Sequence, residues 1–232
     1  DASFRTFYRK KSAKKTSIII HSKKEKEKNL LIYDAVNKLL IKNKILAPKL
    51  ISENYGENFI EIQDFGKHTV YDLLKKRSIN KINLYQKVID LLNRIQNIKN
   101  YENKNFKGKI YKIPIYSHDK LFTEARLFTD WYTKKFISKK ALKKVNYSIH
   151  QQIKYLLSNL KLKNKVFVHR DFHASNLMNH KNQLAIIDSQ DAVFGNEAYD
   201  LASLIDDVRF ISNNKLKQKV YDYYIRSKKK PF

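Results

Sequence analysis

The first part of the chain contains short segments dominated by aromatic and β-branched residues, the pattern of β-strands. Such segments cover residues 4–9, 17–21, 47–52 and 58–65. Between the second and third of them, residues 24–43 space apolar side chains three and four positions apart, which predicts an amphipathic helix. We therefore predict a small β-rich unit that contains one helix.

From residue 69 onward the spacing of apolar positions becomes mainly helical. Helices are predicted at residues 70–76, 82–98, 119–136, 148–160, 197–210 and 215–225. Two short apolar segments, residues 165–169 and 184–188, interrupt this run, and we interpret them as a strand pair. The chain is thus predicted to be an α+β protein with two lobes, residues 1–65 and 66–232, joined near residues 63–66.

The composition indicates a folded protein and narrows the chemistry that it can carry. Of the 232 residues, 42% are hydrophobic and 12% are aromatic, enough to bury the core of one large domain or of two closely packed lobes. The chain has no cysteine, which excludes disulfide bonds, thiolate metal sites and thiol nucleophiles. Oxygen and nitrogen groups must therefore carry any catalysis.

The formal net charge of +26 could indicate a nucleic-acid or membrane partner. However, the basic runs, such as residues 10–11 and 14–15, are short and dispersed, and no strand combines basic and aromatic residues as an RNA-binding strand does. No apolar stretch reaches the roughly 18 residues of a membrane span, and no signal peptide is recognisable. We therefore expect a cytoplasmic monomer with neither a specific nucleic-acid partner nor a membrane span.

The most specific feature is the segment Val168–Leu177, which reads V-H-R-D-F-H-A-S-N-L. It contains H-R-D-x-x-x-x-N, the spacing of a kinase catalytic loop, and the next apolar strand ends in Asp188. Asp171 at the loop tip can accept the proton of an attacking hydroxyl. Asn176 and Asp188 offer oxygen ligands to Mg²⁺, which neutralises nucleotide phosphates. Each residue alone could merely cap a turn or end a strand, but their joint spacing favours phosphoryl transfer.

These motifs and three further segments resemble the aminoglycoside and choline kinase-like phosphotransferases, above all their bacterial branch of N-acetylmuramate/N-acetylglucosamine anomeric kinases. The segments are residues 1–9, 121–132 and 188–195, the last running into residues 199–204. The resemblance implies the bilobal protein-kinase-like fold, with a small β-rich N-lobe and a larger helical C-lobe, and ATP and Mg²⁺ as cofactors. It spans residues 1–207, and members of the branch continue further, so we expect part of the helical lobe to be missing.

The resemblance also implies a nucleotide site. The first residues would form a turn over the ATP phosphates, with Arg5 or Arg9 as a cation, and residues 63–66 would form the hinge that holds the adenine. The expected nucleotide-binding residues are Ser3, Phe4, Arg5, Arg9, Ile18, Gln63, Asp64 and Phe65. A protein kinase would place a lysine on the following strand, where this chain has Ile20 or His21, so the phosphate cation is left unassigned.

On the acceptor side, the predicted helix at residues 119–136 is expected to turn Glu124 toward a sugar hydroxyl. Its expected buried face comprises Leu121, Leu127, Phe128 and Trp131. The expected acceptor-binding residues are Glu124, His173, Gln190 and Asp191. His169 and Asp200 are expected to support the catalytic loop.

The acceptor that the resemblance favours is an amino sugar, N-acetylmuramate or N-acetylglucosamine, phosphorylated at its anomeric hydroxyl by direct in-line transfer. An aminoglycoside, choline or another alcohol stays open as the acceptor, and so does a non-catalytic kinase-like module that only binds nucleotide or a partner. Asp188-Ser189-Gln190 stands where a protein kinase has D-F-G, and no A-P-E segment follows, which disfavours a protein kinase.

Overall fold

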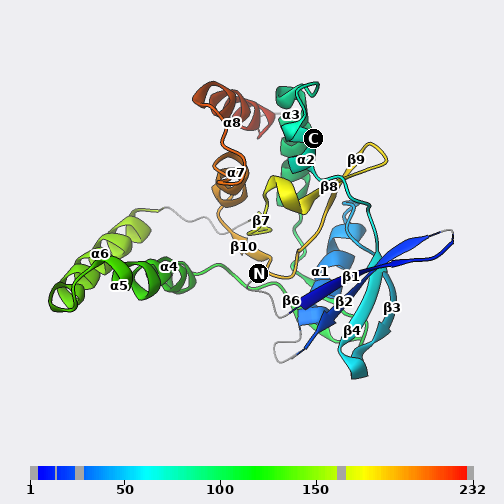
Figure 1. Ribbon diagram of the computed structural model, residues 1–232, viewed down its shortest axis with the longest axis horizontal. Helices are drawn as coiled ribbons and strands as arrows, with labels where there is room; N and C mark the ends of the chain where they lie inside the picture. Colours follow the sequence, from blue (N-terminus) through cyan, green and yellow to red (C-terminus); the bar gives the residue numbers. More distant parts are fainter. Residues whose placement is uncertain (1–4, 14, 24–28, 161–165, 229–232) are drawn as a thin grey trace.

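The computed structural model describes residues 5–13, 15–23, 29–160 and 166–228 and shows two lobes (Figure 1). The N-terminal lobe contains an antiparallel four-stranded sheet of order β1-β2-β4-β3. The strands are β1 (Arg5–Lys11), β2 (Thr16–Ser22), β3 (Leu50–Asn54) and β4 (Phe59–Gln63), with a 3-10 turn, η1 (Tyr55–Glu57), between the last two. The four predicted strands are therefore present, with bounds shifted by a few residues.

The helix α1 (Asn29–Lys42) packs on this sheet and completes its core. Ile20 of β2 lies opposite Ile60 of β4, and both are completely buried. Leu30 and Tyr33 of α1 cover them, so the side chains that alternate to one face of the sheet meet the apolar stripe of the helix. The predicted helix over residues 24–43 is thus confirmed from residue 29 onward, and residues 24–28 lie outside the described residues.

The C-terminal lobe is built around helices and contains the larger core. Its helices are α2 (Val70–Lys75), α3 (Lys81–Gln96), α7 (Ala198–Ile205) and α8 (Asn214–Lys228). The helix α3 contacts both α7 and α8, and it contributes the completely buried Val88, Leu92 and Ile95. The helix predicted at residues 197–210 is shorter than expected, because the chain turns after Ile205 and Asp207 accepts a hydrogen bond from the Arg209 backbone N–H.

Three two-stranded ribbons lie in the remaining part of the described chain, and the first of them packs against α1. The pairs are β5 (Glu102–Lys104) with β6 (Ile110–Lys112), β7 (Val166–Val168) with β10 (Val193–Gly195), and β8 (Leu177–His180) with β9 (Gln183–Ile186). The two predicted apolar strands are present as β7 and β9, but the prediction that they pair with each other is wrong. Instead β9 folds back on β8 through Lys181 and Asn182, whose φ angles of 49° and 63° give the tight turn of a hairpin. The short and partly polar β8 has no alternating pattern that could have predicted it.

The helices α4 (His118–Leu127), α5 (Thr133–Phe136) and α6 (Lys139–Asn159) form an arm that extends away from the lobes (Figure 1). A π-helical turn, η2 (Phe128–Tyr132), joins α4 to α5. The prediction of a buried face here is wrong for three of its four members: Leu127, Phe128 and Trp131 are 52%, 50% and 72% exposed, and only Leu121 packs against a core cluster. Periodicity locates an apolar stripe, but the described part of the chain supplies no element that covers this one.

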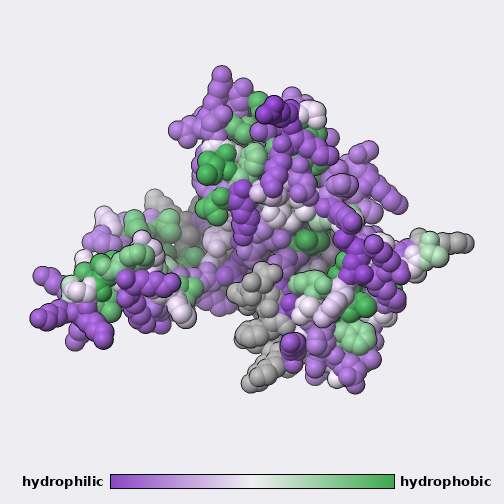
Figure 2. Space-filling model, viewed as in Figure 1, coloured by the Kyte–Doolittle hydropathy of each residue, from purple (hydrophilic) through white to green (hydrophobic). Residues whose placement is uncertain are grey.

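The surface of the molecule is largely hydrophilic, with apolar side chains gathered in patches on the arm (Figure 2). Among the described helices, none is both long enough and apolar enough to cross a membrane.

Candidate active site

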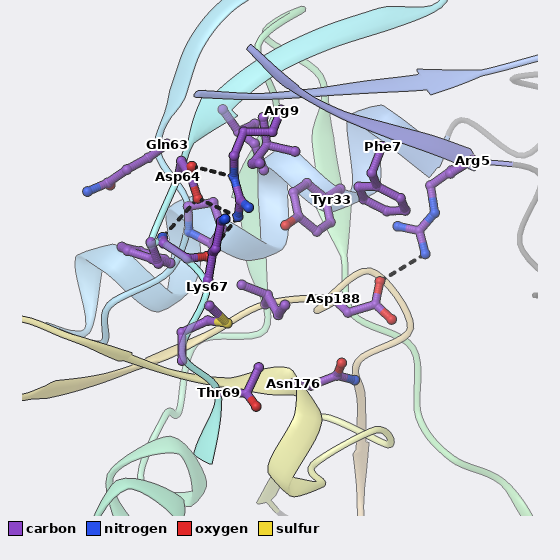
Figure 3. Close-up of a pocket in the computed structure, with 17 residues that line it drawn as sticks. Arg5, Phe7, Arg9, Tyr33, Gln63, Asp64, Lys67, Thr69, Asn176 and Asp188 are labelled. Atoms are coloured by element: carbon purple, nitrogen blue, oxygen red, sulfur yellow. Dashed lines mark hydrogen bonds and ion pairs between the residues drawn. The ribbon is translucent and has the colours of Figure 1, made fainter. Parts of the chain in front are cut away.

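A cavity of about 560 Å³ lies between the two lobes (Figure 3). Ile18 and Ile62 of the N-lobe sheet and Met178 and Ile187 of the C-lobe give it apolar walls. Polar residues line both of its ends: the connection between the lobes forms one, and Asn176 with Asp188 forms the other. An apolar slot with polar ends suits a flat base that carries a charged tail.

The catalytic loop follows β7 and is fixed from the interior of the C-lobe. Asp200, completely buried at the start of α7, accepts the backbone N–H groups of His169 at 2.7 Å and Arg170 at 3.0 Å. His169 Nε2 lies 3.1 Å from the carbonyl oxygen of Ile187, and burial lowers the pKa of His169 to about 4. The neutral imidazole therefore donates from Nε2 to that carbonyl. Both residues were expected to support this loop, and these are the contacts that the structure gives them.

Two of the three residues expected to carry chemistry, Asn176 and Asp188, line one end of the cavity, and Asp171 is joined to them through a hydrogen bond from Asn176. Asn176 lies in the 3-10 turn η3 (Ala174–Asn176), and its side-chain Nδ2 donates to the backbone oxygen of Asp171 at 3.1 Å. The backbone oxygen of Asn176 accepts a hydrogen bond from the Ile187 N–H at 3.1 Å. Asp188 follows directly, with a left-handed φ of 64° that turns the chain at the cavity. Burial, and then the charge of Asp188, raise the pKa of Asp171, which makes its carboxylate a stronger proton acceptor.

Arg5 of β1 lines the same end of the cavity and points toward Asp188 (Figure 3). Its Nη2 lies 2.9 Å from Asp188 Oδ1, and its Nη1 donates to Gln190 Oε1 at 2.7 Å. Gln190 in turn donates from Nε2 to Asp191 Oδ2 at 2.7 Å. Gln190 and Asp191, expected on the acceptor side, therefore lie in one hydrogen-bonded chain with Asp188.

Two residues of α1 that the sequence analysis missed also fix this end of the site. Ser189 donates to Asn37 Oδ1 at 2.7 Å, and both residues are buried. Tyr33 lines the cavity, and burial raises its pKa to about 12, so it remains a neutral phenol. Both positions fall on the buried side of an amphipathic helix, and nothing in the pattern distinguishes them from ordinary core positions.

The connection between the lobes contains the predicted hinge residues. Arg9 Nε lies 2.8 Å from Asp64 Oδ2, and its Nη2 donates to the Gly66 carbonyl oxygen at 2.8 Å. Although burial opposes the effect, hydrogen bonds from Arg9 and the Gly66 backbone N–H lower the pKa of Asp64. Gly66 has a φ of 93°, which favours glycine here. Gln63 lines the cavity, and Phe65 packs against Met178 of β8.

Glu124 of α4 lies beside the catalytic loop but is already engaged. Arg170 Nη2 donates to Glu124 Oε1 at 2.7 Å, and the Tyr116 hydroxyl donates to Glu124 Oε2. The Arg170 guanidinium also lies 5.3 Å from the centroid of the Tyr116 ring, which packs edge-on against Tyr199. Arg170 itself has a left-handed φ of 74°. Glu124 thus links the arm to the residue that precedes Asp171.

His173 lies on the other side of Asp171. Its Nε2 is 3.3 Å from Asn176 Nδ2, and burial together with the positive charge of Arg209 lowers its pKa. His173 is therefore expected to be neutral at pH 7, able to accept or donate a hydrogen bond. Ser3 and Phe4, expected over the phosphates, lie outside the described residues.

The donor set at Asn176 and Asp188 fits Mg²⁺. Among the described residues, no group of three or more histidines and carboxylates is arranged to hold a metal ion. Mg²⁺ does not require one, since it commonly takes one or two protein oxygen ligands and completes its shell with substrate phosphates and water. A carboxylate and an amide on adjoining turns, at the polar end of a nucleotide-sized cavity, meet that requirement.

The sequence profile of the phosphotransferase enzyme family matches residues 1–227 of this chain. The chain is also 26% identical, over 207 residues, to a protein of Neisseria meningitidis serogroup B named N-acetylmuramate/N-acetylglucosamine kinase, covering 89% of this chain and 59% of that protein. A protein of Pseudomonas putida with the same name is 26% identical over 212 residues, covering 91% of this chain and 59% of the relative. The chain thus spans 59% of the length of these relatives.

Solved structures with the same fold include aminoglycoside phosphotransferase APH(2'')-Ib bound to ADP, with a TM-score of 0.62 and 15% identity over 97% of this chain and 78% of that one. Amicoumacin kinase hAmiN, in complex with AMP-PNP, Ca²⁺ and Ami, gives a TM-score of 0.65 and 14% identity over 97% and 69% of the two chains. The predicted α+β fold with two kinase-like lobes is confirmed.

Proposed function

Since the chain belongs to the phosphotransferase enzyme family, we propose that the protein is an ATP-dependent kinase that transfers the γ-phosphoryl group to a hydroxyl of a small molecule. The observation that carries this proposal is that Asn176 and Asp188 line one end of an interlobe cavity of about 560 Å³, with Asn176 bonded to the backbone of Asp171. The ADP and AMP-PNP complexes among proteins of the same fold support a nucleotide in that cavity.

In this proposal each part of the site has a chemical task. The apolar walls, with Ile18 and Ile62, hold the adenine against the hinge. A Mg²⁺ ion bound by Asn176 and Asp188 would neutralise charge on the nucleotide phosphates. Asp171 orients the acceptor hydroxyl and accepts its proton as the oxygen attacks the γ-phosphorus, with ADP as the leaving group. The raised pKa of Asp171 makes it a better proton acceptor than a solvent-exposed aspartate.

For the acceptor we propose an N-acetylated amino sugar phosphorylated at its anomeric hydroxyl. The names of the relatives in N. meningitidis and P. putida support this choice. The pairing of Glu124 with Arg170 supports it as well, because a cationic aminoglycoside would need a carboxylate that is not already neutralised.

A panel assay tests the function and the acceptor together. ADP release is measured with ATP and Mg²⁺ in the presence of N-acetylmuramate, N-acetylglucosamine, its 1-O-methyl glycoside, streptomycin or choline. We expect turnover with the two free sugars and none with the methyl glycoside, which lacks the anomeric hydroxyl. Turnover only with streptomycin or choline would reject the amino sugar, and ADP binding without any turnover would favour a non-catalytic module.

A further inference from the structure

We propose that Arg5 is an exchangeable counter-ion of the site: it neutralises Asp188 before nucleotide binds and transfers to phosphate oxygens when a divalent cation occupies the carboxylate. The inference rests on the proposed function, since it requires a nucleotide in the interlobe cavity. It gives Arg5 of β1 the role of the cation that binds the nucleotide phosphates, which the sequence left unassigned.

The geometry shows a guanidinium already positioned at the metal end of the cavity. Arg5 Nη2 lies 2.9 Å from Asp188 Oδ1 although the two residues are 183 positions apart in the chain. The Arg5 side chain is 8% exposed, whereas the Asp188 side chain is 34% exposed and open to the cavity. The ion pair therefore crosses from one lobe to the other at the point where the nucleotide tail is expected.

The other cations of the cavity are placed differently. Among the described residues that line it, the cationic ones are Arg5, Arg9 and Lys67. Arg9 is bound to Asp64 and to the Gly66 carbonyl oxygen at the hinge, and Lys67 lies beside it (Figure 3). Arg5 alone of the three lies at the end formed by Asn176 and Asp188. Of Ile20 and His21, the two residues expected where a protein kinase has its lysine, Ile20 is completely buried.

Charge balance makes an exchange necessary once a divalent cation binds. A largely buried guanidinium needs an anionic partner, and Asp188 supplies one while the site is empty of nucleotide. A divalent cation on the same carboxylate would compete with Arg5 and repel it. The nucleotide arrives with phosphate oxygens that match the planar guanidinium fork as well as a carboxylate does. Arg5 then keeps an anionic partner throughout, and Asp188 is released for the metal.

Gln190 holds the arginine in place while its partner changes. Its Oε1 accepts from Arg5 Nη1 at 2.7 Å, and its own amide is fixed by a 2.7 Å bond to Asp191 Oδ2. The Phe7 ring, with its centroid 5.6 Å from Arg5 Cζ, adds a second contact. Neither contact involves Nη2, so both can persist while Nη2 exchanges carboxylate for phosphate.

Binding of ADP and of adenosine, each titrated against Mg²⁺ concentration by calorimetry, tests the inference without relying on turnover. Arg5→Ala should weaken ADP binding at saturating Mg²⁺ by about tenfold or more and leave adenosine binding within about twofold. It should also lower the Mg²⁺ concentration that gives half of the maximal gain in ADP affinity, because no guanidinium competes for Asp188. Arg5→Lys, which keeps the charge but not the fork, should give intermediate values in both measurements.

Lys10→Ala is the matched control, because it removes one positive charge from the same strand at an exposed pair with Glu61. It should change neither measurement. An equal loss of ADP and adenosine affinity in Arg5→Ala would overturn the inference, and so would an unchanged or higher Mg²⁺ requirement in that variant or in Arg5→Lys. If the unmodified protein binds adenosine but shows no gain for ADP, the proposed function fails instead; a thermal melt of each variant verifies that it is folded.

Discussion

The catalytic loop is held from two sides, and the two sides differ in how much water they exclude. On the interior side, His169 and Asp200 are completely buried, and their side chains form hydrogen bonds with backbone groups. On the side of the arm, Arg170 and Glu124 form an ion pair whose side chains are 27% and 37% exposed. A hydrogen bond contributes more to the free energy of unfolding when it is buried, because a buried group that loses its partner cannot bond to water instead. We therefore expect the interior contacts to contribute more to the stability of the loop than the ion pair on the side of the arm.

Asp171 lies between the two sides, and its replacement is expected to have the largest effect on activity. Asp171→Asn removes the proton acceptor while keeping the size of the side chain. We expect kcat to fall by about 10³-fold, within the usual range for a general base, with the ADP dissociation constant changed by less than about twofold. Steady-state kinetics and calorimetry measure the two quantities. A kcat within about tenfold of the unmodified enzyme would mean that another group accepts the proton.

Breaking the interior side should destabilise the whole protein. Asp200→Ala leaves the backbone N–H groups of His169 and Arg170 buried without their acceptor. Two lost bonds of this kind predict a decrease of about 3 kcal/mol in the free energy of unfolding, measured with urea. Asp222→Ala on α8, where the aspartate accepts an exposed bond from Gln218, is the control and should cost less than about 1 kcal/mol. Similar values for the two variants would contradict the distinction drawn here.

The buried His169 should also give the interior side a pH dependence. Its pKa falls from 6.5 to about 4 on folding, so the unfolded chain binds the extra proton between these values and protonation favours unfolding. The free energy of unfolding of the unmodified protein, measured relative to that of His169→Gln, should therefore be highest above pH 6.5. It should decrease as the pH falls from 6.5 toward 4, by about 3 kcal/mol in total.

The difference between the two proteins is the quantity to measure, because Asp200 titrates in the opposite sense. Burial raises the pKa of Asp200 to about 7, so its contribution to stability decreases as the pH rises from 3.8 toward 7. Urea titrations of both proteins at several pH values between 4 and 8 give the difference. A difference that stays constant over this range would show that His169 is not held neutral.

The smallest effect on stability is expected on the arm side. Glu124→Gln removes the charge that pairs with Arg170 but keeps an acceptor for the Tyr116 hydroxyl. We expect the free energy of unfolding to fall by less than about 1 kcal/mol and kcat/KM for the acceptor to fall by about tenfold. Asp130→Asn, at an exposed pair with Arg126 on the same arm, is the matched control and should leave kcat/KM unchanged. Equal kinetics for the two variants would remove Glu124 from the acceptor side.

Local pattern was sufficient to predict much of the fold and to group the residues proposed to carry the chemistry. The strands and the helix of the N-lobe follow from side-chain alternation, which burial imposes on any chain whatever its partners. The H-R-D-x-x-x-x-N spacing placed Asp171 and Asn176 on one loop, and the family match confirms the resemblance that it carries. The boundary between lobes at residue 65 and the individual site assignments stay predictions.

Other features depend on contacts between distant parts of the chain and left no local signal. The apolar stripe that runs from α4 into η2 has the period of a buried face, yet Trp131 of η2 is 72% exposed, because the period alone does not say whether another element covers it. Likewise β7 and β9 are each recognisable as a strand, but β7 pairs with β10 and β9 pairs with β8, and the local pattern does not specify the partner. Asn37 and Tyr116 matter only through the side chains that they meet.

The sequence by itself determined which residues can accept a proton or bind a cation and which segments can form strands, because these properties belong to the side chains and to their local spacing. Only the tertiary structure decided which charges are neutralised. The sequence does not distinguish Arg5 from Arg9 on the same strand, whereas in the structure Arg5 pairs with Asp188. Nor does the sequence show that Glu124 pairs with Arg170. The physical reason is that pairing and loss of water depend on approach in space, which the order of residues along the chain does not specify.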